Sequence, residues 1–291
     1  MTILINNVKS KNIFIINSVI IYNMNSFSKI CRDIKSIKIQ GAINVAKAGI
    51  KAYSLKPTKK AKNLLIHLRP TEPALFHALN IAEKISPEKA LQHFDNAQNV
   101  INHYVFNFIQ YKSVIFTHCH SNTLANALIH THKSGKRFSV ISTETRPLFQ
   151  GRKTAKQLSK AGIKVIQITD SAVHEFIKNT NLVMIGADAV LNSGVINKTG
   201  STTIAEIAHV HKKPFYVVAD SWKFYPKNIK IESRHPKEVW NKSSKNLNIR
   251  NPSFELIPKN YITKIISEFG VQTHNQFIKS AKKSLKNSVS A

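Results

Sequence analysis

The hydrophobic pattern of the second half of the chain repeats one cycle: a short apolar run, a polar turn and an amphipathic helical segment. Short apolar runs that alternate with helical patterns are typical of the buried strands of a parallel sheet built from βαβ units. The predicted strands are Ser113–Thr117, Phe138–Ile141, Val165–Ile168, Leu182–Ile185 and Phe215–Val218. The pattern therefore predicts an α/β fold for this part of the chain.

Residues 24–111 have a helical pattern instead, broken at Gln40-Gly41 and by a short extended run at Leu64–His67. The expected helices are Ala42–Tyr53, Glu72–Ile85 and a long helix from Pro87 to about Tyr111. We therefore expect an N-terminal helical domain over 24–111, followed by a Rossmann-like domain with a mainly parallel β-sheet over 112–270.

The two ends of the chain have weaker patterns. Residues 1–23 carry lysines without acidic residues, and we interpret them as an extension or a wrongly assigned start, because Met24 precedes the first good helical segment. Near the other end, residues 251–258 predict a final strand and turn, and Tyr261–Glu268 a closing helix. We expect residues 271–291 to form a basic C-terminal tail.

Composition places the chain among folded proteins, because 42% of its residues are hydrophobic. Its 43 basic and 15 acidic residues give a formal net charge of +28, which is typical of proteins that bind nucleic acid or anionic substrates. The lysines are scattered, however, and only Lys56–Lys62 and Lys279–Lys283 form runs. We therefore favour a solvated basic surface, with nucleic-acid contact that is at most non-specific.

Cysteine usage and hydropathy suggest the compartment. Two cysteines, Cys31 and Cys119, cannot form a disulfide framework, so the sequence predicts a cytoplasmic protein. Its apolar stretches are all shorter than the roughly 20 residues that span a bilayer, so we expect no membrane association.

Cys119 and Asp188 are the strongest candidates for chemistry, because each directly follows a predicted strand. In parallel sheets, ligands bind beyond the carboxyl ends of the strands. Cys119 also precedes a predicted helix that begins at Asn122, and the helix dipole is expected to lower its pKa; the alternative is a structural cysteine. We expect partial burial to raise the pKa of Asp188, unless this residue only caps a turn. Together they could move a proton without a cofactor.

Other groups near the strand ends refine this picture. His118, Cys119 and His120 are consecutive, so their side chains diverge and cannot chelate one metal ion together. Cations that could hold an anionic substrate lie at helix starts or strand ends, although each alone would ordinarily be a surface charge. They are Arg69, Arg146, Arg152, Lys198 and Lys223. The loop Asn197–Ser201 precedes a predicted helix, which suits a phosphate or a polar sugar.

Several motifs occur together in a fixed order. They are Thr117-His118-Cys119-His120-Ser121, Thr143-Glu144-Thr145-Arg146-Pro147 with Gln150-Gly151-Arg152, Gly186-Ala187-Asp188, Asn197-Lys198 and Ser221-Trp222-Lys223-Phe224, flanked by Leu68-Arg69-Pro70-Thr71 and Asn251-Pro252-Ser253-Phe254. The set closely resembles the superfamily that joins ribose-1,5-bisphosphate isomerase, methylthioribose-1-phosphate isomerase and the α, β and δ subunits of eukaryotic initiation factor 2B. The match covers about residues 30–270.

The resemblance implies an aldose–ketose isomerase that needs no cofactor. Regulatory subunits of the superfamily typically lack the cysteine and the aspartate, whereas methylthioribose-1-phosphate isomerases usually carry Arg at the position of Ala189. The closest match is therefore to the ribose-1,5-bisphosphate isomerases, which implies Cys119 as proton acceptor and Asp188 as proton donor. Implied substrate contacts are Arg69, Ser121, Asn122, Thr123, Asn197, Lys198 and Lys223, to which the charge argument adds Arg146.

The chain also departs from the family. The family's phosphate loop, Arg-Gly-Ala-Gly, reads Gln40-Gly41-Ala42-Ile43 here, so one charge-assisted contact worth ~1.5–3 kcal/mol is missing. His120 and Thr199 replace an asparagine and an isoleucine of the family motifs. We still expect Gln40, Gly41 and Ala42 to bind the substrate, as part of a helical domain that covers the open strand ends.

The resemblance leaves two alternatives. One is a non-catalytic regulatory subunit, similar to those of the initiation factor, that binds a sugar phosphate or nucleotide; the other is methylthioribose-1-phosphate isomerase. The expected partners are a small sugar bisphosphate and further copies of the chain, in a homodimer or homohexamer.

Overall fold

The computed structural model describes residues 26–242 and 244–290. The described residues form two compact units, the first from residue 26 to Pro70 and from Leu75 to Leu91, and the second from Thr71 to Ala74 and from Gln92 onward. The interpretation of residues 1–23 as an extension or a wrongly assigned start concerns residues outside the described part. The predicted domain boundaries at 23, 111 and 270 stay predictions.

The described part of the first unit is helical, as expected. It contains a helix over 26–35, α2 (Ala42–Leu55), α3 (Lys59–Leu68), most of α4 (Pro73–Lys84) and the start of α5 (Pro87–Phe108). The small face of α2 allows close packing, since a Cβ atom at Gly49 would lie 2.3 Å from Leu75 Cδ1. The expected extended run at Leu64–His67 is wrong: Thr58 caps α3 through the Ala61 amide (3.2 Å), and Leu65 is buried within that helix.

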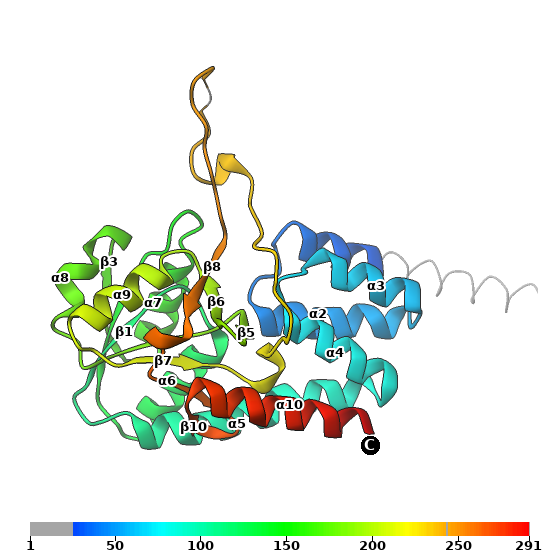
Figure 1. The fold of residues 1–291 in the computed structure, drawn as a ribbon, viewed down its shortest axis with the longest axis horizontal. Helices are drawn as coiled ribbons and strands as arrows, with labels where there is room; N and C mark the ends of the chain where they lie inside the picture. The colour runs from blue at the N-terminus through cyan, green and yellow to red at the C-terminus, as the bar shows by residue number, and fades with distance from the viewer. Residues whose placement is uncertain (1–25, 243, 291) are drawn as a thin grey trace, which may run out of the picture. The chain divides into compact units, whose positions relative to one another are not determined.

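The second unit contains all five predicted strands in one parallel arrangement, so the predicted fold class is confirmed (Figure 1). They are β1 (Val114–Thr117), β2 (Ser139–Thr143), β3 (Lys164–Ile168), β4 (Leu182–Ile185) and β7 (Phe215–Val218). Two further strands, β9 (Lys264–Ser267) and β10 (Gly270–Gln272), complete the order β10-β9-β7-β4-β1-β2-β3. Only β10 is antiparallel to its neighbour.

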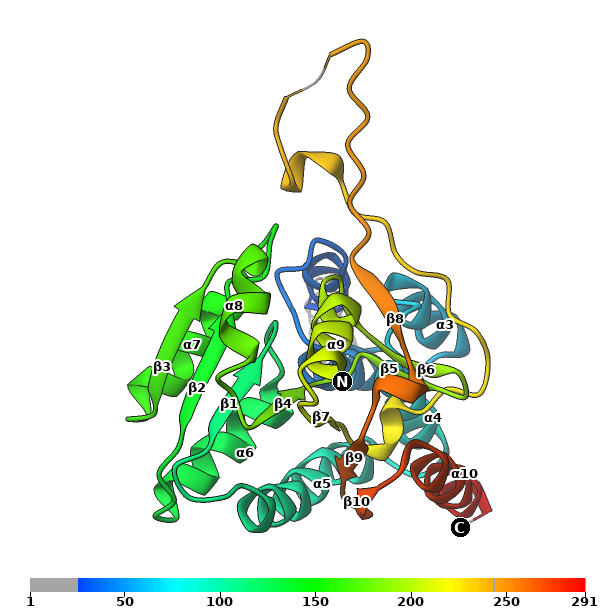
Figure 2. The same ribbon diagram turned by 60° about the vertical axis from the view of Figure 1, so that its left-hand side comes forward.

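Helices cover both faces of the central strands, which are therefore buried along most of their length, whereas the edge strand β3 is largely exposed. Successive residues of one strand enter opposite cores: Ile115 packs with residues of α5, α6 (Asn122–Lys133) and α7 (Gln150–Lys160). Phe116 packs with residues of α8 (Val173–Ile177), α9 (Ser201–Val210) and α10 (His274–Ser290). Figure 2 shows α8 and α9 on one side of the sheet, and α6 on the other.

A second, smaller sheet was only partly expected from the sequence. It has the antiparallel order β5-β6-β8, formed by β5 (Ala189–Leu191), β6 (Gly194–Lys198) and β8 (Phe254–Pro258). The predicted strand within 251–258 is confirmed as β8, whereas the hairpin of β5 and β6 was missed. This hairpin carries the chain from the end of β4 to the start of α9.

Two expectations at the C-terminal end fail. Tyr261–Glu268 is not a helix: after the short 3₁₀ helix η4 (Lys259–Tyr261), strand β9 pairs with β7, and Ile265 and Ile266 are fully buried. Within 271–291, expected as a basic tail, α10 buries Phe277, Ile278 and Ala281 in the core. The lysines of α10 are exposed on its other face, and their number in the sequence is the reason that this segment was predicted to be a basic tail.

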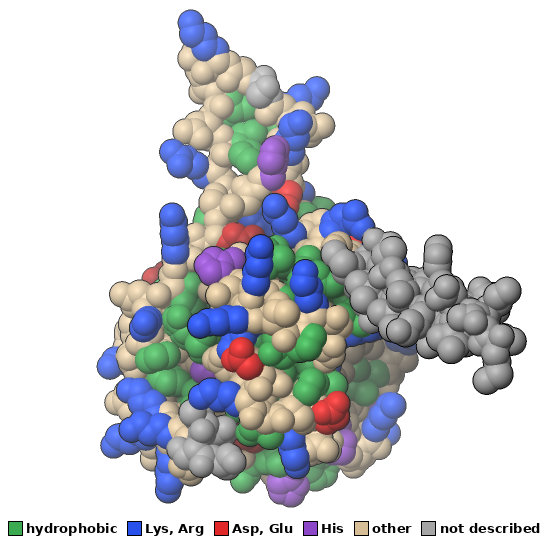
Figure 3. Space-filling view, turned by 90° about the vertical axis from the view of Figure 1, so that its right-hand side faces the viewer, with side chains coloured by type: hydrophobic (Ala, Val, Ile, Leu, Met, Phe, Trp, Pro, Cys, Tyr) green, Lys and Arg blue, Asp and Glu red, His purple; other side chains and the backbone are tan. Residues whose placement is uncertain are grey.

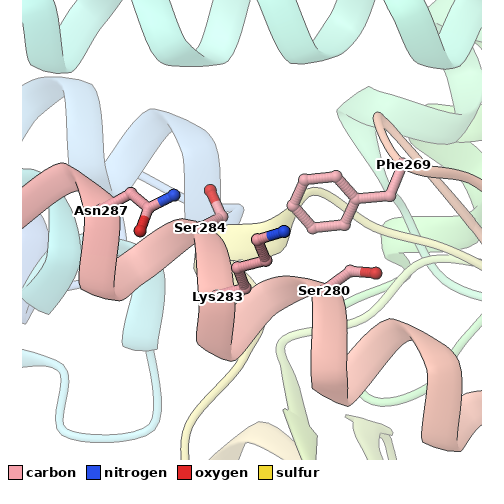
Figure 4. Close-up of a pocket in the computed structure, with 5 residues that line it drawn as sticks. All are labelled: Phe269, Ser280, Lys283, Ser284 and Asn287. Carbon is pink, nitrogen blue, oxygen red and sulfur yellow. The ribbon is translucent and has the colours of Figure 1, made fainter.

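Surface features complete the description. A surface pocket along α10 is lined by Phe269, Ser280, Lys283, Ser284 and Asn287, with Lys283 extending toward the Phe269 ring (Figure 4). None of the predicted site residues lines it. Lys and Arg side chains are scattered over the face shown in Figure 3 rather than gathered in one stripe. Among the described residues, no helix combines the length and apolar character needed to cross a bilayer.

Candidate functional site

The strand order places a topological switch point between β1 and β4. From β1 the chain proceeds to β2 and β3 on one side, and later to β4 and β7 on the other. Loops that leave the carboxyl ends of such strands diverge there and open a crevice, the usual ligand site of open α/β sheets. Cys119 follows β1 and Asp188 follows β4, so the two candidate catalytic residues flank this switch point.

Cys119 is held by hydrogen bonds to both of its peptide groups. Its backbone has φ 64°, a left-handed conformation that is uncommon for a residue other than glycine. The Cys119 N–H donates to Thr145 Oγ1 (3.0 Å), and the Thr154 hydroxyl donates to the Cys119 carbonyl (2.8 Å). Thr145 is fixed in turn, because its own N–H donates to Asp170 Oδ1 (2.7 Å). Side chains from the loop after β2, from α7 and from the turn after β3 therefore fix Cys119.

A glycine brings Asp188 close to Cys119. A Cβ atom at Gly186 would lie 2.5 Å from Ser121 Cβ, so only glycine lets the loop after β4 pass this close to the Cys119 loop. The Asp188 N–H donates to the Ile196 carbonyl (2.9 Å), which anchors Asp188 at the base of the β5–β6 hairpin. Its carboxylate lies near enough to influence the ionisation of the thiol.

The pKa of Cys119 is raised to about 12, so the expected lowering by the helix dipole is wrong. Burial is the largest cause, since it removes water from the thiolate, and the negative charge of Asp188 adds to it. The backbone amide of His120 and the charge of Lys198 act in the opposite direction but do not outweigh them. The thiol is therefore protonated at neutral pH.

Lys198 lies beside this pair. It is only 5% exposed, and burial lowers its pKa, whereas the charges of Cys119 and Asp188 oppose that shift. Arg234 and Glu238, from the connection between β7 and β8, also act on Lys198. Arg234 donates to Glu238 Oε1 (2.6 Å), so these two charges largely compensate each other. The result is a buried cation next to a thiol and a carboxylate.

The N-terminus of α9 was expected to bind a phosphate, but a side chain of the protein already accepts hydrogen bonds from its backbone amides. Glu255 Oε1 accepts hydrogen bonds from the Gly200 N–H (2.9 Å) and the Thr202 N–H (2.6 Å). Asn197 Nδ2 donates to Ser201 Oγ (3.1 Å), whose hydroxyl donates to the Lys198 carbonyl (2.7 Å). An anion here would meet the Glu255 carboxylate instead of free amides, so this expectation for the backbone is wrong.

The start of α6 carries three predicted substrate contacts. Ser121 caps the helix, with Oγ accepting from the Leu124 N–H (3.3 Å). The Asn122 side chain lies 2.9 Å from His120 Nε2, and Thr123 is buried. Burial lowers the pKa of His120 to about 4, so this ring is neutral at physiological pH.

Lys223 belongs to a buried charged cluster that sequence reasoning missed. It lies in the 3₁₀ helix η2 (Ser221–Lys223) after β7, beside Asp220. His93 stacks on Trp222 with ring centroids 3.8 Å apart, and its Nε2 lies 3.5 Å from Asp220 Oδ1. Burial acts to raise the pKa of Asp220, but His93 and Lys223 outweigh it and the pKa is lowered. The available signal was the position of Asp220 two residues after the end of a predicted strand.

The two predicted arginines after β2 serve other contacts. Arg146 is exposed, and its Nη2 donates to the Val239 carbonyl (2.9 Å). Arg152 forms an ion pair with Glu144 (2.6 Å). The charge of Arg152 is therefore paired, whereas Arg146 donates to a neutral carbonyl, and the predicted substrate contact of Arg146 stays a prediction.

The remaining candidates lie in the first unit. Gly41 is the N-cap of α2 with φ 85°, and Ala42 is the first residue of that helix. The Gln40 carbonyl accepts from Asn44 Nδ2 (3.0 Å). Arg69 is the C-cap of α3 and is 7% exposed. The closure of Gln40, Gly41, Ala42 and Arg69 over the strand ends stays a prediction.

No group of three or more His, Cys, Asp or Glu side chains with the geometry of a metal site occurs among the described residues. His118 and His120 instead bond to threonine side chains.

A partly buried thiol and carboxylate beside a buried lysine, at the switch point of a doubly wound sheet, define a site for a small polar ligand, and comparison identifies the family. Residues 35–274 match the model of the initiation factor 2 subunit family, so the chain belongs to this family, as the motif resemblance predicted.

Its relatives include both enzymes and translation factors. Ribose 1,5-bisphosphate isomerase of Methanocaldococcus jannaschii is 35% identical over 272 residues, which cover 82% of this chain and 88% of that protein. Methylthioribose-1-phosphate isomerase of Dehalococcoides mccartyi is 34% identical over 245 residues, 75% of this chain and 73% of the relative. Among solved structures, the translation initiation factor eIF-2B of Pyrococcus horikoshii is similar, with a TM-score of 0.78 and 26% sequence identity. The match covers 87% of this chain and 98% of the chain in that structure.

Proposed function

We propose that this chain is an aldose–ketose isomerase that converts ribose 1,5-bisphosphate to ribulose 1,5-bisphosphate by acid–base catalysis with Cys119 and Asp188. The observation that carries the proposal is the approach of Asp188 to Cys119 at the switch point, where the carboxylate raises the pKa of the thiol. Relatives named ribose 1,5-bisphosphate isomerase, 31–35% identical over more than four fifths of this chain, support the choice of substrate.

The chemistry of ribose 1,5-bisphosphate determines which oxygen the Asp188 carboxylic acid can protonate. The O1 oxygen of ribose 1,5-bisphosphate carries a phosphate, so the proton that opens the ring must go to the ring oxygen O4. In the proposed first step the Asp188 carboxylic acid donates this proton and the C1–O4 bond breaks. The Cys119 thiolate removes the proton from C2, and the C–H electron pair forms the C1=C2 double bond of an enol.

The second step returns both groups to their starting states. The Cys119 thiol donates its proton to C1, and the Asp188 carboxylate accepts the proton of the O2 hydroxyl as the C2 carbonyl forms. The product is the 2-ketose with both phosphates retained, and each residue has gained and lost one proton. General acid–base groups of this kind each contribute roughly 10²–10⁴-fold to the rate.

The raised pKa of Cys119 fits a pair that shares one proton. At neutral pH the resting pair is a thiol beside a carboxylate, whereas the reactive form is a thiolate beside a carboxylic acid. A proton transfer within the pair converts one into the other without a change in net charge. Lys198, which faces both groups, stabilises the single negative charge in either form.

The phosphates are assigned to side chains rather than to the start of α9. In the proposal, Lys198, Lys223 and Arg69 bind them, together with Ser121, Asn122 and Asn197 and the loop at Gln40, Gly41 and Ala42. The start of α2 suits this role, since Gly41 is an N-cap without a side chain and leaves the first amides of the helix for an anion. Assembly into a homodimer or homohexamer is part of the same proposal.

The test is direct. Purified protein is incubated with ribose 1,5-bisphosphate and, separately, with methylthioribose 1-phosphate, and the ketose product is measured. We expect turnover of the bisphosphate, and we expect Cys119→Ser and Asp188→Asn each to lower kcat by at least about 100-fold with the fold intact by circular dichroism.

Other outcomes select the alternatives. Turnover of methylthioribose 1-phosphate alone would identify that sugar as the substrate. Absence of either product at high protein concentration would favour a regulatory subunit. Substantial residual activity in either variant would contradict the assigned roles.

A further inference from the structure

A chain of hydrogen bonds links Cys119 to the loop that follows Lys198. The Cys119 N–H donates to Thr145 Oγ1 (3.0 Å), which lies 3.2 Å from Thr143 Oγ1. Thr143 Oγ1 is 2.6 Å from His118 Nδ1, and His118 Nε2 is 3.1 Å from the Thr199 carbonyl oxygen. All three side chains in the chain are buried, so water does not replace any of these bonds.

The groups at the two ends of this series of hydrogen bonds, the Thr199 carbonyl and the Cys119 N–H, fix the donor and the acceptor of every bond between them. A carbonyl oxygen only accepts, so His118 Nε2 carries a proton and donates it to the Thr199 carbonyl. In a neutral imidazole Nδ1 is then an acceptor, and the nearest hydroxyl, that of Thr143, donates to it. The Thr143 oxygen is left to accept from the Thr145 hydroxyl, and the Thr145 oxygen accepts from the Cys119 N–H.

We propose that His118 is a positioning residue that, as its Nε2–H tautomer, orients the Thr143 and Thr145 hydroxyls and so holds Cys119 in its left-handed conformation, tied to the loop of Lys198. This inference deepens the proposed function, because it assigns the groups that align the proton acceptor. His118 itself does not contact the reacting atoms in this role.

Close backbone packing supports a built arrangement. A Cβ atom at Gly151 would lie 1.8 Å from the Thr143 carbonyl oxygen and 2.9 Å from Thr145 Oγ1. Only glycine at this position therefore lets α7 pack against the hydrogen-bonded threonines. On the other side, Gly200 has φ 104°, and a Cβ atom on it would lie 3.3 Å from His118 Nε2. Two glycines from different elements thus enclose the imidazole and its hydroxyls.

The charge state of the ring agrees with this direction. Burial lowers the pKa of His118 to about 4; the charge of Asp170 opposes this shift, and that of Lys198 adds to it. An imidazolium would donate from both nitrogens and would reverse the Thr143 hydroxyl. A neutral ring keeps the chain in one direction throughout the physiological range.

The test compares Thr145→Val, which removes the hydroxyl at constant volume, with Thr145→Ser, which keeps it. Both are made in a Cys31→Ser background, so that iodoacetamide reports on Cys119 alone. We expect Thr145→Val to lower kcat by about 10- to 100-fold with KM within threefold, and to speed alkylation of Cys119 as its loop loosens. Thr145→Ser should restore both values to within about threefold of the parent.

Thr131→Val is the matched control, because it removes a fully buried hydroxyl that bonds only within α6. It should leave kcat and the alkylation rate unchanged. Equal losses in Thr145→Val and Thr145→Ser, or an unchanged Thr145→Val, would overturn the proposal. If the parent protein does not isomerise the bisphosphate, the proposed function fails, but the alkylation rates still decide this inference.

A second measurement needs no variant. Long-range ¹⁵N–¹H NMR of the histidine-labelled protein distinguishes protonated from unprotonated ring nitrogens, and His118 is assigned through contacts of its Hε1 with Gly200. We expect the neutral Nε2–H tautomer at neutral pH. An Nδ1–H tautomer or an imidazolium would overturn the proposal even if Thr145→Val failed to fold.

Discussion

At Cys119, burial and a neighbouring carboxylate act against the helix dipole and outweigh it. A helix N-terminus stabilises an exposed thiolate by a modest amount, since water screens the dipole and its effect falls off within the first turn. Burial removes the solvation of the thiolate itself, and Asp188 adds a like charge. The thiol therefore keeps its proton until a partner in the site accepts it.

Alkylation measures this shift directly. Below a raised pKa the thiolate fraction is small and grows with pH, so the reaction of Cys119 with iodoacetamide in Cys31→Ser protein should keep accelerating up to about pH 12 instead of levelling near pH 9. Asp188→Asn removes the like charge, lowers the pKa of the thiol and should speed the reaction at any fixed pH below it. A plateau near pH 9 or below, or no change in Asp188→Asn, would contradict the described electrostatics.

At the scale of elements, α9 shows how a helix terminus that looks like an anion site can be filled by the protein itself. Gly200 provides the left-handed N-cap, and Glu255 reaches across from β8 to accept two amides. The carboxylate also complements the positive end of the helix dipole. The proposed function therefore assigns the phosphates of the substrate to Lys198 and other side chains.

Glu255→Ala should lower the free energy of unfolding by roughly 1–2 kcal/mol, because the amides of Gly200 and Thr202 lose their acceptor. Glu255→Gln keeps an acceptor oxygen and should lose less. Urea denaturation followed by circular dichroism measures both. Equal stability of Glu255→Ala and the parent would show that water or a neighbouring group replaces the cap.

At the scale of the whole molecule, the proposal requires the first unit to bring its phosphate loop to the second. The motif resemblance predicts that Gln40 replaces an arginine of the phosphate loop, so Gln40→Arg should add a charge-assisted contact. Such a contact persists from the bound substrate to the transition state, so the gain should appear as a KM lowered by about 10-fold with kcat little changed. Steady-state kinetics with ribose 1,5-bisphosphate measure it. An unchanged KM would mean that Gln40 does not contact the substrate.

The sequence by itself determined the five-stranded parallel core and the placement of Cys119 and Asp188 at one edge of the sheet. Strands buried on both faces must be continuous apolar runs, and the carboxyl ends of parallel strands share one edge. Cys119 and Asp188 each follow a strand by a few residues, so both belong to that edge, and the strand order of the folded sheet then made them neighbours by placing β1 beside β4.

The tertiary structure alone decided the features that depend on distant partners. Lys264–Ser267 is a strand because it pairs with β7, and the start of α9 is closed by a glutamate 55 residues from Gly200. The pKa of Cys119 depends on burial and on Asp188, and the direction of the His118 hydrogen bonds depends on the Thr199 carbonyl. Local sequence patterns do not predict this strand pairing, this helix cap, this pKa or this hydrogen-bond direction. Each depends on which distant groups come together in the folded protein and on which of them lose contact with water.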